Sequence, residues 1–234
     1  MENGTKTCFI ISGGDFAKMP YDIPSGAFIT ACDCGLDHAM KMGIVPDLVI
    51  GDLDSVSDKG KRFMEDNDIK CLLYPSDKDD TDTALAVKYL ISQGFNDLRI
   101  MCAFGGRYDH ELGNIAAARY AALRGAVVRL EGADTRAVVF SGRSGSEGNA
   151  AAGSVSAGNV SKRSVSVERA DGFSLSVISL TDKCSGVYIK GAKYELENAV
   201  INGDSTLGVS NEFVDDTVTV SVGDGVLMVV MARM

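Results

Sequence analysis

The feature that most constrains the fold is a regular alternation of short apolar runs with patterns of helical period between residues 7 and 131. Such alternation is typical of a parallel sheet whose strands are joined by helices. Strands are expected at residues 8–12, 28–32, 48–50, 69–74, 98–103 and 127–130, and helices at 36–42, 58–67, 82–93 and 111–123. The first part of the chain is therefore predicted to be an α/β domain with a mainly parallel sheet.

The character of the sequence changes after residue 140. Residues 141–164 are dominated by Gly, Ser, Ala and Asn, which is typical of a flexible insertion or linker. Short alternating runs follow at 165–167, 175–180, 187–189, 217–222 and 226–231, separated by turn residues. This pattern favours an antiparallel β-sandwich or half of a barrel. We therefore expect an α/β domain at 1–140, a Gly/Ser-rich linker at 141–164 and an all-β sandwich domain at 165–234.

Four acidic clusters lie where a predicted strand ends or a predicted helix begins. They occupy residues 32–35, 51–55, 77–82 and 105–110. In an open α/β sheet the strand ends that precede helices share one edge, so these carboxylates can converge on one crevice. Two carboxylates about 4 Å apart repel by about 4 kcal/mol at an effective dielectric constant of 20. Because a divalent cation would remove that repulsion, the sequence predicts a cation site at this edge.

The motif Gly-Asp-Leu-Asp-Ser at 51–55 is the strongest of these candidates. Residues two apart in an extended chain point to the same side, so Asp52 and Asp54 are expected to face one ion. Magnesium prefers carboxylate and phosphate oxygens and keeps several waters, so two or three carboxylates suffice. The alternative is an ordinary acidic turn that caps a helix beginning near Ser57.

Two further clusters are candidates for cation or phosphate binding. Acidic residues at 77–82 would complement the dipole of the helix they open, but four carboxylates exceed what a cap needs. In the motif Gly-Gly-Arg-Tyr-Asp-His at 105–110, the glycines allow a ligand close to the backbone and Arg107 offers a fork for phosphate oxygens. The alternative for this motif is a surface turn. The chain has neither the Gly-x-x-x-x-Gly-Lys-Ser/Thr phosphate loop nor the Gly-x-Gly-x-x-Gly dinucleotide motif. Any nucleotide would therefore be bound by another route.

Composition excludes several classes of function. The net charge of −9 argues against nucleic acid and anionic membranes as partners, and no apolar segment is long enough to span a bilayer. Without an export signal, a cytoplasmic protein with six reduced cysteines is expected.

Cys32, Cys34 and His38 could bind zinc, but the chain has no Cys-x-x-Cys and only two histidines. The absence of a Gly-x-Ser-x-Gly elbow argues against a serine hydrolase.

Taken together, the motifs resemble those of thiamine pyrophosphokinases. The matching segments are Asp-Cys-Gly-Leu-Asp-His at 33–38, Pro-Asp-Leu-Val-Ile-Gly-Asp-Leu-Asp-Ser at 46–55, Lys-Asp-Asp-Thr-Asp at 78–82, Gly-Gly-Arg-Tyr-Asp-His at 105–110 and Leu-Gly-Val-Ser-Asn-Glu-Phe at 207–213. The resemblance implies an α/β domain that binds ATP and Mg²⁺, a β-sandwich that binds thiamine, and a homodimer with active sites at the subunit interface. It also implies transfer of the diphosphate of ATP to the hydroxyl of thiamine, giving thiamine diphosphate and AMP.

The resemblance also implies roles for individual residues. It assigns magnesium to Asp33, Asp52, Asp54 and Asp79, with Asp82 as the alternative to Asp79. It assigns catalytic roles to Asp54, Asp79, Asp82 and Asp109, and contacts with nucleotide or thiamine to Ser55, Lys78, Arg107, His110, Ser210 and Asn211. Which aspartate accepts the hydroxyl proton stays open among Asp79, Asp82 and Asp109. Two positions depart from the family pattern, since Cys34 stands where Gly is usual and Asp37 where Asn is common.

Three alternatives use the same residues differently. A pyrophosphokinase acting on a pterin alcohol would keep the carboxylates of the first domain but would not need residues 210–212. A magnesium-dependent phosphohydrolase would direct the same carboxylates at water. A non-catalytic scaffold would bind thiamine or calcium without turning over ATP.

Overall fold

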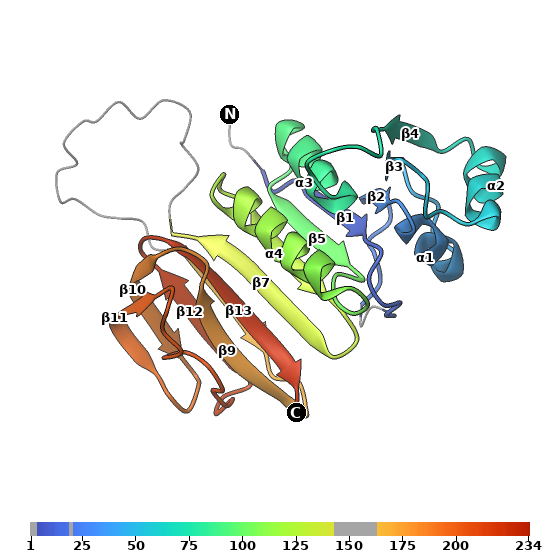
Figure 1. The fold of residues 1–234 in the computed structure, drawn as a ribbon. Coiled ribbons are helices and arrows are strands. Elements are labelled where there is room, and N and C mark those ends of the chain that lie inside the picture. Colours follow the sequence, from blue (N-terminus) through green and yellow to red (C-terminus); the bar gives the residue numbers. More distant parts are fainter. Residues whose placement is uncertain (1–3, 19–20, 143–162) are drawn as a thin grey trace, which may run out of the picture. The chain divides into compact units, whose positions relative to one another are not determined.

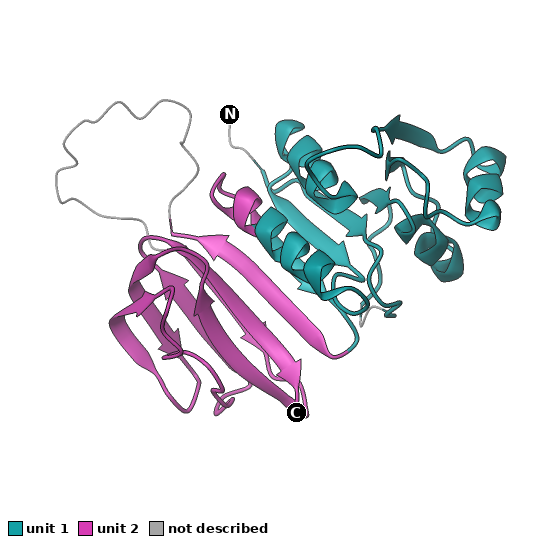
Figure 2. Ribbon diagram, viewed as in Figure 1, with its two compact units in different colours: residues 1–118, 128–133 teal, residues 119–127, 134–234 magenta. Residues whose placement is uncertain are grey.

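The computed structural model describes residues 4–18, 21–142 and 163–234. The chain divides into two compact units, of which unit 1 takes in residues 1–118 and 128–133 and unit 2 takes in 119–127 and 134–234 (Figure 2). Each unit has a hydrophobic core of its own. Of the predicted linker at 141–164, residues 143–162 lie outside the described part of the chain.

Unit 1 contains the predicted α/β sheet. Its strands lie in the order β4 (Lys70–Leu73), β3 (Leu48–Gly51), β2 (Phe28–Cys32), β1 (Thr7–Ile11), β5 (Asp97–Met101) and β6 (Val127–Glu131) (Figure 1). The pairs from β4 through β5 are all parallel. The helices are α1 (Gly35–Met42), α2 (Asp58–Asp66), α3 (Asp82–Ser92) and α4 (Tyr108–Ala122), the last of which reaches unit 2. The predicted α/β class is confirmed, with element bounds that differ from the predicted ones by a few residues.

Local signals explain where the helices of unit 1 begin. Ser57 and Thr81 are the N-cap residues of α2 and α3, and their hydroxyls accept hydrogen bonds from the N–H groups of Gly60 and Ala84. One core cluster joins β1, β2 and β3 to α1 through fully buried side chains such as Ile11. Since the strands are held by this core, the loops that leave their carboxyl ends have fixed starting points.

Unit 2 consists of antiparallel strands in two sheets. One sheet orders β7 (Thr135–Ser141), β13 (Val226–Arg233) and β9 (Phe173–Ser179), and the other orders β11 (Leu196–Asn202), β10 (Lys183–Lys190), β12 (Thr217–Val222) and β8 (Arg163–Glu168). Buried residues of both sheets, among them Val177, Val187 and Leu227, share one core. The predicted β-sandwich is therefore confirmed.

Two strands of unit 2 are missing from the sequence prediction. β11 shows no apolar alternation, because Ile201 is its one buried residue. β7 (Thr135–Ser141) spans the predicted domain boundary at 140 and groups with unit 2. A strand without alternating burial carries no period for the sequence to show.

Neither a membrane-spanning helix nor a disulfide is found among the described residues. None of their helices is long and apolar enough to cross a membrane. The six cysteines are free thiols. Burial raises the pKa of Cys8 to about 12 and holds that of Cys32 well above its usual value, so both thiols are protonated.

Candidate active site

A crevice of about 680 Å³ lies in unit 1, at the carboxyl ends of its parallel strands. Its walls come from the loops after β1, β2, β3, β4 and β5, from the first turn of α3 and from the first two turns of α4. Of the predicted site residues, it is lined by Asp33, Asp52, Asp54, Ser55, Lys78, Asp79, Asp82, Arg107 and His110. The sheet edge predicted from the sequence therefore does gather these side chains.

Three carboxylates meet most closely in this crevice. Oxygens of Asp33, Asp52 and Asp82 all lie within 4.8 Å of one another. Asp33 follows β2, Asp52 follows β3 and Asp82 begins α3, so distant parts of the chain supply the group. Below, these residues are called the carboxylate triad.

We expected an extended chain at 51–55, in which Asp52 and Asp54 would point to the same side. This expectation was wrong, because the backbone turns at Leu53. Leu53 has a φ of 63°, a left-handed conformation that branched side chains rarely adopt. The turn lets the N–H of Asp54 donate to Oδ1 of Asp52 over 3.1 Å. Asp52 therefore joins the carboxylate triad, while Asp54 projects into the more exposed part of the crevice.

Gly51 makes the close approach of the triad possible. Its φ is 153°, and a Cβ placed there would lie 3.2 Å from the carboxyl carbon of Asp82 and 3.3 Å from Cβ of Asp33. Since contacts this short are rare for real side chains, any larger residue would push two of the three carboxylates apart.

Lys78 supplies a positive charge inside the carboxylate triad. Its Nζ lies 2.7 Å from Asp52 and 3.1 Å from Asp82, and the three side chains are only 11–19% exposed. The hydrogen bond from Lys78, followed by the N–H of Asp54, holds the pKa of Asp52 well below its usual value. Burial acts in the opposite direction on Asp82 and raises its pKa. One lysine among three carboxylates leaves the group with an excess of negative charge.

The carboxylate triad fits a divalent cation that prefers oxygen ligands. Oδ1 of Asp33 is buried and has no hydrogen-bond partner, while its Oδ2 accepts a hydrogen bond from Ser55 Oγ. An unpartnered buried carboxylate oxygen is costly unless a cation or water meets it. Three carboxylates that bring their oxygens together in this way form the kind of ligand set that magnesium binds.

The remaining predicted residues of the first domain lie around the triad. Asp54 and Asp79 are exposed and line the crevice outside the triad. Asp52 raises the pKa of Asp54 by hydrogen bonding and like charge. Arg107 and Asp109 form an exposed ion pair with a 2.6 Å contact, which lowers the pKa of Asp109. Asp109 is thereby turned toward Arg107 and is not among the lining residues.

Several lining residues were missed by the sequence analysis. Gly13 and Gly14 follow β1 at the same edge, and Glu111 and Asn114 come from α4. The glycine pair after the apolar run at 8–12 was a usable signal, because Gly105 and Gly106 follow another apolar run in a similar way. Glu111 and Asn114 gave no signal, since their role depends on which face of α4 meets the loop after β5.

Ser210 and Asn211, the residues predicted to contact thiamine, belong to unit 2. Ser210 is exposed, with a φ of 59°. Asn211 is 3% exposed, and its amide bonds the N–H and the C=O of Tyr194, each over 2.9 Å. Its carbonyl oxygen also accepts from the N–H of Glu212. The side chain of Asn211 therefore holds the turn on which Ser210 lies.

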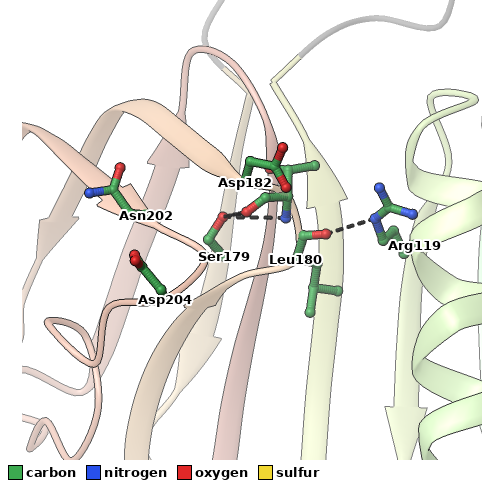
Figure 3. Close-up of a pocket in the computed structure, with 8 residues that line it drawn as sticks. Arg119, Ser179, Leu180, Asp182, Asn202 and Asp204 are labelled. Carbon is green, nitrogen blue, oxygen red and sulfur yellow. Dashed lines mark hydrogen bonds between the residues drawn. The ribbon is translucent and has the colours of Figure 1, made fainter.

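A second hollow, of about 630 Å³, lies within unit 2 (Figure 3). Asn202 and Asp204 lie on one side of it and Arg119 on the other, where Arg119 Nε donates to the carbonyl of Leu180 over 2.7 Å. None of the predicted site residues lines it. The hollow offers no group of converging side chains comparable to the carboxylate triad.

Two models of known protein families match the chain, one in its first part and one in its second. The family model described as "Thiamin pyrophosphokinase, catalytic domain" matches residues 23–128. The model described as "Thiamin pyrophosphokinase, vitamin B1 binding domain" matches residues 162–227. Together the two models span most of the chain, and they define its class as a two-domain pyrophosphokinase.

Individual relatives support the same assignment. A thiamine pyrophosphokinase from Bacillus subtilis (strain 168) is 28% identical over 230 residues, which cover 96% of this chain and 98% of that protein. The crystal structure of a thiamine pyrophosphokinase from Bacillus subtilis matches with a TM-score of 0.77 at 23% identity, over 98% of this chain and all of the other. The enzyme from Candida albicans matches with a TM-score of 0.72 at 14% identity, over 98% of this chain and 90% of the other. The chain belongs to the thiamine pyrophosphokinase family, and the resemblance seen in the sequence is confirmed.

Proposed function

We propose that this protein transfers the diphosphate of ATP to the hydroxyl of thiamine, giving thiamine diphosphate and AMP. Membership of the family supports pyrophosphoryl transfer to thiamine. The observation that carries the proposal is the convergence of Asp33, Asp52 and Asp82 in one crevice. The match of residues 162–227 to a vitamin B1 binding domain favours thiamine over a pterin alcohol as acceptor.

The carboxylate triad would hold Mg²⁺, with Asp82 rather than Asp79 as the third ligand. Asp82 is the better candidate because its oxygen lies within 4.8 Å of the other two, whereas Asp79 is exposed at the rim. When bound, the ion supplies positive charge to phosphate oxygens that would otherwise be repelled by the crevice. Asp54 and Asp79 remain as lining carboxylates.

Four other residues would bind and orient the nucleotide. Lys78 and Arg107 carry the positive charge on the crevice wall, and Ser55 and His110 offer polar atoms beside them. Arg107 can present two parallel N–H groups to phosphate oxygens once it exchanges Asp109 for the nucleotide. The crevice would thereby orient the triphosphate before reaction.

In the transfer step the hydroxyl oxygen of thiamine forms a bond to the β-phosphorus, and the bond from that phosphorus to the α,β-bridging oxygen breaks. AMP leaves with the bridging oxygen, and the hydroxyl proton passes to a carboxylate. We assign proton acceptance to Asp54 or Asp79, because both line the crevice outside the triad. Asp82 is engaged by Lys78, and Asp109 by Arg107.

Unit 2 would contribute the thiamine contacts at residues 210–212. Ser210 offers an exposed hydroxyl and Asn211 fixes the turn.

We further propose that the protein acts as a homodimer. Exposed apolar side chains of unit 2 support this, namely Tyr194, Leu207, Val209 and Val214.

The proposal is tested by incubating the protein with ATP, Mg²⁺ and thiamine and separating the products. AMP and thiamine diphosphate in equal amounts are expected, with no reaction when Mg²⁺ is chelated. ADP with thiamine monophosphate would contradict the proposal. Phosphate released at the same rate without thiamine would instead identify a phosphohydrolase.

A further inference from the structure

The four residues that follow β5, from Cys102 to Gly105, are hydrogen-bonded by three other parts of unit 1. The carbonyls of Cys102 and Phe104 accept hydrogen bonds from the N–H groups of Gly14 and Asp15, at 3.0 Å and 2.9 Å. These bonds join the segment to the loop after β1. The backbone groups of the alternate residues, Ala103 and Gly105, are bonded by other parts of unit 1.

The N–H of Ala103 donates to the carbonyl of Glu131 in β6 over 2.9 Å. The other two bonds come from side chains of α4. Nδ2 of Asn114 donates to the carbonyl of Ala103 over 2.8 Å, and Oε1 of Glu111 accepts from the N–H of Gly105 over 2.6 Å. Residues three apart on a helix share a face, so the two side chains reach the segment together. A donor meets the C=O and a charged acceptor meets the N–H, which is a matched pair of contacts.

The turn beyond this segment depends on such contacts. Gly105 and Gly106 have φ values of 88° and 74°, and glycine loses more conformational freedom on ordering than any other residue. Arg107 follows at once and lines the crevice. The position of its guanidinium group therefore depends on how well the two glycines are held.

We infer that Glu111 and Asn114 are positioning residues, which hold the turn at 105–106 in its binding conformation before the nucleotide arrives. The inference rests on the proposed function, and it deepens the account of the same crevice. Because Oε1 of Glu111 accepts the hydrogen bond of the Gly105 N–H, this carboxylate organises the turn. Ordering the turn in advance spares the nucleotide that entropic cost.

The test compares Glu111→Ala with Glu111→Gln, which keeps an acceptor oxygen but removes the charge. Leu112→Ala is the matched control, because Leu112 is 49% exposed on the same turn of α4. The first readout is hydrogen exchange of the Gly105 amide in protein without nucleotide. The second is the KM for ATP and the kcat with thiamine. Since the first readout needs no turnover, it stays informative even if the proposed reaction is wrong.

In Glu111→Ala we expect protection of the Gly105 amide to fall at least about tenfold and the KM for ATP to rise about tenfold, the size of one lost hydrogen bond to a charged group. The kcat should change much less. Glu111→Gln should retain most of the amide protection and a KM for ATP close to that of the wild type. Leu112→Ala should change neither quantity. Unchanged amide protection in Glu111→Ala, or equal damage in Glu111→Gln, would overturn the inference.

Asn114→Ala provides an independent check on the other half of the contact. It should raise the KM for ATP in the same direction while the circular dichroism spectrum is retained. If this variant does not fold, Asn114→Asp is used, because its carboxylate keeps the size of Asn114 but cannot donate to Ala103. An unchanged KM in a folded variant would show that Asn114 has no positioning role.

Discussion

The crevice of unit 1 and the sandwich of unit 2 are built in opposite ways. Around the crevice, Asp33, Leu53 and Cys102 have positive φ values, and a buried oxygen of Asp33 has no partner. In β9 of unit 2, buried and partly exposed residues alternate along the whole strand. Strained backbone and incompletely paired carboxylates mark a site for binding, whereas regular alternation marks a structure optimised for burial.

This difference implies that the two units respond differently to substitution. Changes in the crevice should affect activity and metal binding more than folding, because its residues are few and charged. Changes in the core of the sandwich should affect folding, because each buried side chain contributes apolar area.

The largest effect is expected from Asp52→Asn in the carboxylate triad. The amide keeps the shape and can still accept a hydrogen bond from Lys78, but it removes the negative charge that would bind the ion. We expect kcat to fall about 10²- to 10³-fold, as when other preorganised electrostatic groups are removed. Measuring turnover and urea unfolding side by side tests this, with unfolding expected to change little.

The control for this prediction is Asp66→Asn. Asp66 is exposed at the end of α2, outside the lining of the crevice. It should leave turnover and Mg²⁺ dependence unchanged. Near-normal activity of Asp52→Asn with the same Mg²⁺ dependence would refute the metal role of the triad.

On the other side of the contrast, Leu227→Ala should mainly affect stability. Leu227 is fully buried in the core of the sandwich. Deleting a buried leucine side chain costs about 2–5 kcal/mol through lost burial and the cavity left behind. Denaturant unfolding followed by circular dichroism measures this cost. Val200→Ala, a 46% exposed position on β11, should cost less than about 0.5 kcal/mol.

A smaller change is expected from Lys78→Met, in protein without metal. Without Lys78 Nζ, the carboxylates of Asp52 and Asp82 lose their partner and repel each other. The free energy of unfolding should fall by about 2 kcal/mol, in the range found for charged hydrogen-bonded pairs. Added Mg²⁺ should therefore raise the Tm of Lys78→Met by more than that of the wild type.

Lys88→Met is the matched control for this comparison. Lys88 forms an ion pair with Asp80, which is not a member of the carboxylate triad. Its response to Mg²⁺ should equal that of the wild type. An equal Tm rise in Lys78→Met and in the wild type would show that Lys78 does not compensate the charge of the triad.

The two regions also differ in what the sequence could predict. Asp33, Asp52 and Asp82 could be placed at one edge because each adjoins a strand end or helix start, and parallel strands share that edge. The choice between Asp79 and Asp82 could not be made, since it depends on how the chain turns before α3. The left-handed Leu53 was equally hidden, because nothing in its side chain favours a positive φ.

In unit 2 the limits were of another kind. Strands with alternating burial, such as β9 and β12, gave a clear period of two. β11 did not, because most of its residues are exposed or partly exposed. The hydrogen bonds of Asn211 with Tyr194 were also hidden, since they join residues 17 apart through a turn that only the folded sheet defines.

The smallest effect concerns His38, behind the crevice. Its Nδ1 lies 3.2 Å from the carbonyl of Ser12, and burial lowers its pKa from the usual value. The unfolded chain, with a His pKa of about 6.5, then binds the proton more readily than the folded protein. His38 therefore contributes stability that is present above about pH 6.5 and is lost as the pH falls below it. Urea unfolding at pH 8 and pH 5.5 should show a smaller loss on acidification in His38→Asn than in the wild type, and an identical loss would exclude this contribution.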